Sequence, residues 1–189
     1  RTGIEECQRF GTVLVGDIAS QGISWNLLQS SDLHAAVFYE CIGLSDERWN
    51  QSFSQYQQWL KSTTETGNAR RGISPHAPYT VNKQAFETLN ESMAAIHLTE
   101  TREELELLEN HAGPFVDFLT GLGVYHPFNL AQLEDLLVGM KDKRCLWIHA
   151  NYLPESLWHH IGSNQSIVYC PRTHAAFGHD SHPYRRMME

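Results

Sequence analysis

The stretch AAIHLTETREELELLEN, residues 94–110, decides the fold class. Residues 94–98 are apolar apart from His97, which is typical of a strand that is covered on both faces. Thr101 and Glu104 have the spacing of a capping box, so a helix is expected to begin directly after Glu100. The stretch therefore predicts a strand that ends near His97, a short turn that carries Glu100, and a helix.

The same alternation runs through the rest of the chain. Short runs rich in Val, Ile and aromatic residues predict strands over 12–18, 35–42, 70–76, 94–98, 145–150 and 166–171. Helices are expected over 46–66, 81–92, 101–109, 114–121, 130–139 and 153–160. Strands that alternate with helices form right-handed βαβ units around a parallel sheet.

Two α/β architectures fit this pattern: an open doubly wound sheet and a part of a (β/α)8 barrel. The sequence contains neither a G-x-G-x-x-G turn nor a phosphate-binding loop after a strand, which removes the support for a nucleotide-binding open sheet. A complete barrel takes about 250 residues, and this chain has 189. We therefore predict a partial (β/α)8 TIM-type barrel, a single incomplete domain over residues 1–189, whose first and last strands are missing.

Polar residues cluster at the ends of the predicted strands. His76, His97 and His149 each end a strand, His174 follows the last strand, and Glu100 lies just beyond His97. The carboxyl ends of barrel strands open onto one face, where active sites lie, so these side chains should converge. Imidazoles bind zinc-type ions, which lower the pKa of a bound water to about 7, and a nearby carboxylate can then move the proton. This set of residues indicates metal-assisted hydrolysis.

Four motifs in this order also resemble one known family. SPHAPYT (74–80), IHLTET (96–101), WIHANYL (147–153) and CPRTHAAFG (170–178) resemble the amidohydrolase superfamily of metal-dependent hydrolases, in its deaminase and chlorohydrolase branch. That branch includes guanine, S-adenosylhomocysteine and aminofutalosine deaminases and the triazine hydrolases. The resemblance covers nearly the whole chain and implies an amidohydrolase-type barrel domain in which the chain supplies roughly strands 2 to 7.

The resemblance implies a role for several of the predicted site residues. His97 would be a metal ligand, Glu100 the catalytic proton shuttle, and His149 the catalytic histidine that orients or polarises the hydroxide. His76 would contact the substrate, and His174, on the same open face, is a second candidate for a substrate contact.

The reaction implied is the hydrolytic deamination of an aminated heterocycle or nucleoside-like small molecule. A hydroxide bound to one divalent metal ion, zinc or iron, would attack the ring carbon that bears the amino group. Chloride could leave by the same route. The alternative is a non-catalytic barrel fragment that serves as a binding or scaffold domain.

The sequence also departs from the family pattern. Relatives bind the metal with an H-x-H pair on the first strand and an aspartate on the eighth, and this chain has no H-x-H and ends before an eighth strand. We therefore expect the fragment by itself to be inactive. Thr173 and His174 stand where many relatives have Ser-Asn, which leaves the substrate open. Glu40 matches a family glutamate to which we assign no role.

Composition limits the partners. With 41% hydrophobic and 19% charged residues and a net charge of −8, the chain has no basic surface for nucleic acid or for an anionic membrane. It contains neither a run long enough to span a bilayer nor a signal peptide, so we expect a cytoplasmic protein with a small-molecule substrate. A homo-oligomer is left open.

Each candidate also has a structural interpretation. His76 lies between prolines and could bond to the backbone of a turn, His97 could be a satisfied core histidine, and Glu100 could only stabilise a helix N-terminus. In TREELELLEN, Leu105 and Leu108 are expected to face the barrel while the glutamates face water. The combination of the four motifs favours catalysis over these interpretations.

Overall fold

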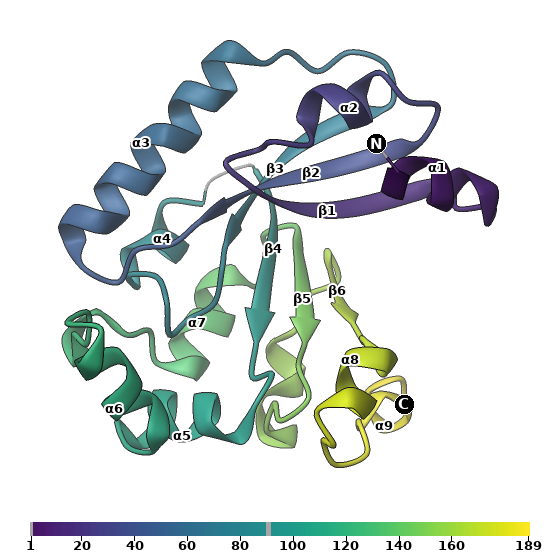
Figure 1. The fold of residues 1–189 in the computed structure, drawn as a ribbon. Helices are drawn as coiled ribbons and strands as arrows, with labels where there is room; N and C mark the ends of the chain where they lie inside the picture. The colour runs from purple at the N-terminus through teal and green to yellow at the C-terminus, as the bar shows by residue number, and fades with distance from the viewer. Residues whose placement is uncertain (1, 90–91) are drawn as a thin grey trace.

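The computed structural model describes residues 2–89 and 92–189 and contains one sheet of six parallel strands (Figure 1). The strands are β1 (Leu14–Ser20), β2 (His34–Cys41), β3 (Ala69–Pro75), β4 (Met93–Leu98), β5 (Cys145–His149) and β6 (Gln165–Val168). Each strand that the sequence predicts is therefore present, with ends shifted by up to three residues.

The order of the strands decides between the two architectures. They lie in the order β1-β2-β3-β4-β5-β6, so every crossover moves to the next strand in the same direction. With right-handed crossovers this order puts all the connecting helices on one face, whereas a doubly wound sheet reverses its strand order near the middle. Figure 1 shows the sheet curled, with α3, α4 and α7 outside it. The six strands form a curled half-barrel, as the prediction of a partial TIM-type barrel requires.

The helices surround this sheet. They are α1 (Thr2–Arg9), α2 (Trp25–Gln29), α3 (Asp46–Ser62), α4 (Gln84–Glu87), α5 (Arg102–Asn110), α6 (Pro114–Gly121), α7 (Leu133–Met140), α8 (Pro171–Ala176) and α9 (Tyr184–Met187). Two 3-10 helices, η1 (Pro127–Asn129) and η2 (Glu155–His160), complete the set in the described residues. The short helices α2, α8 and α9 were not predicted, and residues 153–160, expected as an α-helix, contain η2 instead.

Two predicted helices are shorter than expected for a common reason. The helix predicted over 46–66 ends at Ser62, where the hydroxyls of Ser62 and Thr63 both donate to the carbonyl of Trp59. Of the helix predicted over 81–92, the described residues contain only α4, and it is followed by Thr88, whose hydroxyl donates to the Ala85 carbonyl at 2.9 Å. Residues 90 and 91 lie outside the described part of the chain. Hydroxyl side chains that bond to helix carbonyls compete with the next turn.

The main core lies between the sheet and the outer helices. Tyr39 on β2 packs against two side chains of α3, with ring centroids 5.8 Å from Tyr56 and 5.4 Å from Trp59. Val37 and Ile96 lie in the same cluster and are fully buried. Burial of each large apolar side chain contributes about 1.5–3 kcal/mol, so this layer fixes the strands from outside.

The concave face of the sheet is filled at one point by Phe38. Its ring lies across two glycines of the neighbouring strands, Gly16 and Gly72, and only 1% of Phe38 is exposed. A Cβ on Gly72 would lie 2.5 Å from Cδ1 of Phe38 and 2.8 Å from the carbonyl oxygen of Met93. Any larger residue at position 72 would therefore clash with these neighbours.

We expect Gly72→Ala to destabilise the protein by about 1–3 kcal/mol, because the added methyl group overpacks this contact. The control is Gly139→Ala on α7, where a Cβ meets nothing within 4 Å and a helical alanine is favoured. Urea unfolding of both variants measures the effect, and equal stabilities would contradict it.

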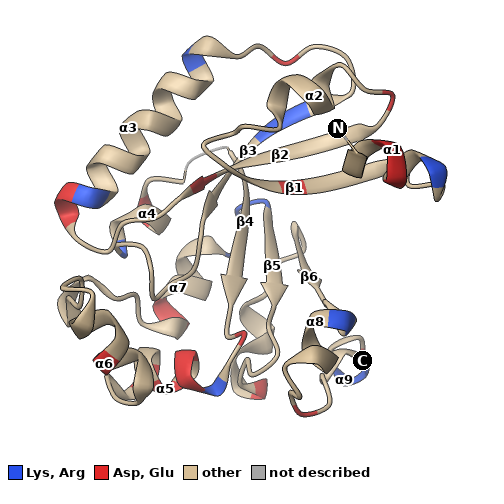
Figure 2. Cartoon of the chain, viewed as in Figure 1, with Lys and Arg blue, Asp and Glu red and all other residues tan. Residues whose placement is uncertain are grey.

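The charged residues lie mostly on helices and loops (Figure 2), and strands β4, β5 and β6 contain no Lys, Arg, Asp or Glu. Within residues 2–89 and 92–189, we find no helix with the length and apolar character needed to cross a bilayer.

Candidate active site

The carboxyl ends of the strands bring the predicted histidines together. The His97 ring on β4 lies 4.9 Å from the ring of His76, which follows β3, and 5.5 Å from the ring of His149, the last residue of β5. The backbone carries this arrangement, because the N–H of His97 donates to the carbonyl of His76 at 2.9 Å. Three residues that are far apart in the chain thus form one row across three neighbouring strands.

The hydrogen bonds of His97 determine which ring nitrogen can bind a metal. Its Nδ1 lies 2.9 Å from the carbonyl oxygen of His76. A carbonyl can only accept, so Nδ1 carries the hydrogen and a neutral His97 has its free lone pair on Nε2. A ring N–H held by a backbone carbonyl is the usual arrangement around histidines that bind metal ions. The chemistry of His97 therefore fits a metal ligand.

Glu100 and His149 form the second pair. Oε1 of Glu100 lies 3.3 Å from Nε2 of His149, and 27% of the Glu100 side chain remains exposed against 8% for His149. Burial, together with the nearby imidazoles of His97, His179, His174 and His182, lowers the pKa of His149 to about 4. The pair is therefore a neutral imidazole beside a carboxylate, and the carboxylate has one side open to solvent.

The buried imidazole of His149 should make stability depend on pH. In the unfolded chain the imidazole has its ordinary pKa of 6.5, whereas in the folded protein its pKa is about 4. Because the unfolded state holds more protons in this window, the free energy of unfolding should fall as the pH drops through it, by at most about 3 kcal/mol from this group.

Urea unfolding at pH 7 and pH 4.5 checks this expectation when wild type and His149→Gln are compared. The comparison is needed because Glu104, whose pKa burial raises to about 8, titrates with the opposite sign. The stability lost in acid should be smaller in the variant, and equal losses would show that His149 does not contribute.

Left-handed backbone is concentrated at this site. The described residues contain five non-glycine residues with positive φ, and three lie here: Thr99 at 43°, His149 at 74° and Ala150 at 52°. For a β-branched threonine this conformation is a clear outlier, and such strain is found where a structure holds a functional geometry. The turns after β4 and β5 are therefore held in place by the contacts around them.

His174, the second predicted substrate contact, is buried and bound to the chain. Its Nδ1 lies 3.2 Å from Oδ1 of Asn151, and the amide nitrogen of Asn151 donates to the carbonyl of Glu100 at 2.9 Å. The side chain of Asn151 thus connects His174 to the backbone of Glu100. Its Nε2 is buried and has no hydrogen-bond partner among the described residues, so this nitrogen is the one left for another group.

His76 and Glu40 lie on the other side of the row. Nδ1 of His76 lies 2.8 Å from the hydroxyl of Thr80. Burial, followed by the neighbouring His97, lowers the pKa of His76, while the charge of Glu40 acts in the opposite direction. Glu40 itself accepts a hydrogen bond from Ser20 at 2.8 Å. Glu40 is therefore close enough to act on the site electrostatically.

Two further histidines at the site, His179 and His182, were not among the predicted site residues. His182 donates from Nε2 to the carbonyl of His149 at 2.8 Å and accepts the N–H of Tyr184 on Nδ1. Both its ring nitrogens are therefore bonded, and the Nε2 bond holds the left-handed turn. His179 lies 3.1 Å from the hydroxyl of Tyr152. The short spacings among His174, His179 and His182 were the only sequence signal for this second cluster.

The expectation that the glutamates of α5 face water is wrong for Glu104. It is only 1% exposed, and its two carboxylate oxygens accept the backbone N–H groups of Thr99 and Glu100 at 2.8 and 2.9 Å. Only one of the two hydrogen bonds of a capping box forms. The hydroxyl of Thr101 accepts the N–H of Glu104 at 3.2 Å, but the side chain of Glu104 bonds to the two residues before Thr101. Leu107 is fully buried beside the predicted Leu108, and Leu105 only partly.

The described residues contain no group of three or more His, Cys, Asp or Glu side chains that could hold a metal ion. His97 fits as one ligand, so a complete zinc-type site with three protein ligands needs residues from outside this stretch.

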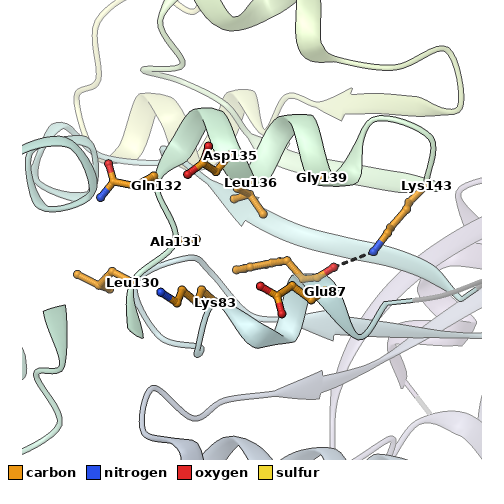
Figure 3. A pocket seen from close by; sticks show the side chains of 10 residues that line it. Lys83, Glu87, Leu130, Ala131, Gln132, Asp135, Leu136, Gly139 and Lys143 are labelled. Carbon is orange, nitrogen blue, oxygen red and sulfur yellow. Dashed lines mark hydrogen bonds between the residues drawn. The ribbon is translucent and has the colours of Figure 1, made fainter. Parts of the chain in front are cut away.

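A cavity of about 490 Å3 lies elsewhere, between α4 and α7 (Figure 3). Leu130 and Leu136 form part of its wall, and Lys143 donates to the carbonyl of Phe86 at 2.7 Å across one end. The cavity is lined by none of the predicted site residues. The histidine row therefore remains the candidate active site.

Comparison with known proteins shows which proteins the chain is similar to. No model of a protein family matches the chain. The chain is 30% identical to an adenosine deaminase of Helicobacter pylori over 173 residues, 85% of this chain and 42% of that protein. It is 25% identical to an aminodeoxyfutalosine deaminase of Deinococcus radiodurans over 198 aligned positions, 92% of this chain and 46% of that protein. The chain spans less than half the length of these curated relatives.

Solved structures agree with the sequence comparison. The crystal structure of Helicobacter pylori aminofutalosine deaminase matches with a TM-score of 0.77 and 27% identity, over 90% of this chain and 46% of that chain. The same enzyme has been solved with methylthio-coformycin. An adenosine deaminase of Xanthomonas campestris with bound zinc matches with a TM-score of 0.62 at 18% identity, over 98% of this chain and 42% of that chain, which shows the shared fold alone. The chain is thus a homologue of the adenosine and aminodeoxyfutalosine deaminases, which are of the amidohydrolase type, and it corresponds to part of their barrel.

Proposed function

We propose that the protein containing this chain is a metal-dependent hydrolase that deaminates an aminated, nucleoside-like heterocycle. The observation that carries the proposal is the row formed by His97, His149 and Glu100: a ring nitrogen free to bind a metal beside a carboxylate that can move a proton. The names of the relatives, which are deaminases of adenosine and of aminodeoxyfutalosine, support this class of substrate.

The metal ion proposed is a single zinc or iron ion. His97 would hold it through Nε2, and the remaining ligands would come from residues outside this stretch. When bound, the ion supplies acidity, because it lowers the pKa of a water in its coordination sphere to about 7. The 189-residue stretch by itself, with one such ligand, is expected to be inactive.

Each of the site residues of this chain has a separate role in the proposed reaction. Glu100 takes a proton from the attacking water on a carboxylate oxygen and delivers it to the departing amino nitrogen, which leaves as ammonia. His149, neutral near pH 7, orients the attacking water by hydrogen bonding. His76 and the free Nε2 of His174 are the proposed contacts to the substrate, because both lie at the same ends of the strands.

The test is ammonia release by the complete, metal-loaded protein with a panel of aminated purine nucleosides and simpler aminated heterocycles. We expect turnover of at least one nucleoside-like compound. Chlorinated analogues in the same panel separate deamination from dechlorination. Absence of ammonia across the panel, with a known deaminase as the positive control, would reject the proposed function.

A further inference from the structure

Glu104 has a buried carboxyl group that the proposed reaction does not use. It is 1% exposed, and each of its oxygens accepts one backbone N–H, from Thr99 at 2.8 Å and from Glu100 at 2.9 Å. Burial raises the pKa of Glu104 to about 8, and the two N–H bonds act in the opposite direction. A buried carboxyl group without hydrogen-bond partners is costly, so these two bonds offset the cost of its burial.

These bonds organise the turn rather than the helix that carries Glu104. A capping-box glutamate would accept the N–H of the N-cap residue, here Thr101. Glu104 instead reaches past Thr101 to the two residues before it, one of which is the left-handed Thr99. A stabiliser of α5 alone would not need this reach.

The carbonyl groups of the same turn are held from the opposite side. The carbonyl of Thr99 accepts the N–H of Tyr152 at 3.1 Å, and the carbonyl of Glu100 accepts the side-chain amide of Asn151 at 2.9 Å. All four backbone polar groups of Thr99 and Glu100 are therefore bonded. Glu104 supplies the acceptors for both N–H groups, so the position of the Glu100 carboxylate depends directly on it.

We infer that Glu104 is the positioning residue for Glu100: its carboxyl group clamps the turn at Thr99 and Glu100 and so holds the Glu100 carboxylate beside His149. The inference rests on the proposed function for its catalytic consequence, but the clamp itself is a property of the structure. A misplacement of about 1 Å in a catalytic group can cost about 100-fold in rate, so small movements of this turn matter.

The test is Glu104→Gln in the complete protein. The amide has the same shape but only one acceptor oxygen, and its NH2 group would face a backbone N–H. We expect kcat to fall by roughly 10- to 100-fold, while KM and metal content stay unchanged, because neither substrate nor metal contacts are altered. The matched control is Glu109→Gln, an exposed glutamate of the same helix, which should leave all three quantities unchanged.

Amide proton NMR provides a second readout that needs no activity. In Glu104→Gln, the resonances of Thr99 and Glu100 should move upfield and exchange faster with solvent, and in Glu109→Gln they should not. Resonances that stay in place overturn the inference, as does unchanged kcat in an active protein. A wild-type protein that releases no ammonia would reject the proposed function. The amide resonances would still show whether Glu104 holds the turn at Thr99 and Glu100.

Discussion

Glu100→Gln in the complete protein is expected to keep its metal and to lose most of its turnover, with kcat lower by about 100- to 10,000-fold. Glutamine has the shape of glutamate but cannot take a proton from the attacking water at neutral pH. Because Glu100 holds its place through backbone bonds to Glu104 and Asn151, the substitution leaves the turn as it is. The loss would therefore report the proton transfer.

Ammonia release and metal content, measured on the same preparations, check this prediction. Glu103→Gln is the control, since it removes a carboxylate from the first turn of α5, three residues further along the chain. It should retain nearly full turnover. If Glu100→Gln turned over at the wild-type rate, Glu100 could not be the proton shuttle. A loss of metal together with activity would indicate that Glu100 is a metal ligand.

His97→Ala is expected to have the second largest effect, the loss of bound metal. Even residues that only orient a ligand cost about 10- to 100-fold in metal affinity when changed, so removing a ligand should exceed 100-fold. The bond from Nδ1 to the His76 carbonyl holds the ring of His97 with Nε2 free, and alanine has no replacement for it.

Elemental analysis of purified complete protein gives the result directly: near-stoichiometric zinc or iron in wild type and little in His97→Ala. His34→Ala removes an exposed histidine from the start of β2 and should bind metal as wild type does. Full metal content in His97→Ala would exclude His97 as a ligand. The 189-residue stretch by itself should be metal-free, and stoichiometric metal there would mean that the site assembles without further ligands.

Much of the fold follows from local patterns. Runs of Val, Ile and aromatic residues located all six strands. The apolar signal is strongest in strands that are buried on both faces, such as β2 and β4. Helix ends were less predictable: α3 ends at Ser62 because two hydroxyls take the carbonyl of Trp59, and a periodic pattern does not contain that competition.

The sequence by itself determined the α/β alternation and the convergence of His76, His97, Glu100 and His149, because the ends of parallel strands necessarily meet at one edge of a sheet. Only the tertiary structure decided the curled order of the strands, the neutral state of His149 and the burial of Glu104. The bonds of Glu104 depend on a left-handed turn that is also held by residues about 50 positions further along the chain. A helical glutamate in an acidic segment looks solvated in sequence, and only packing shows that it is buried.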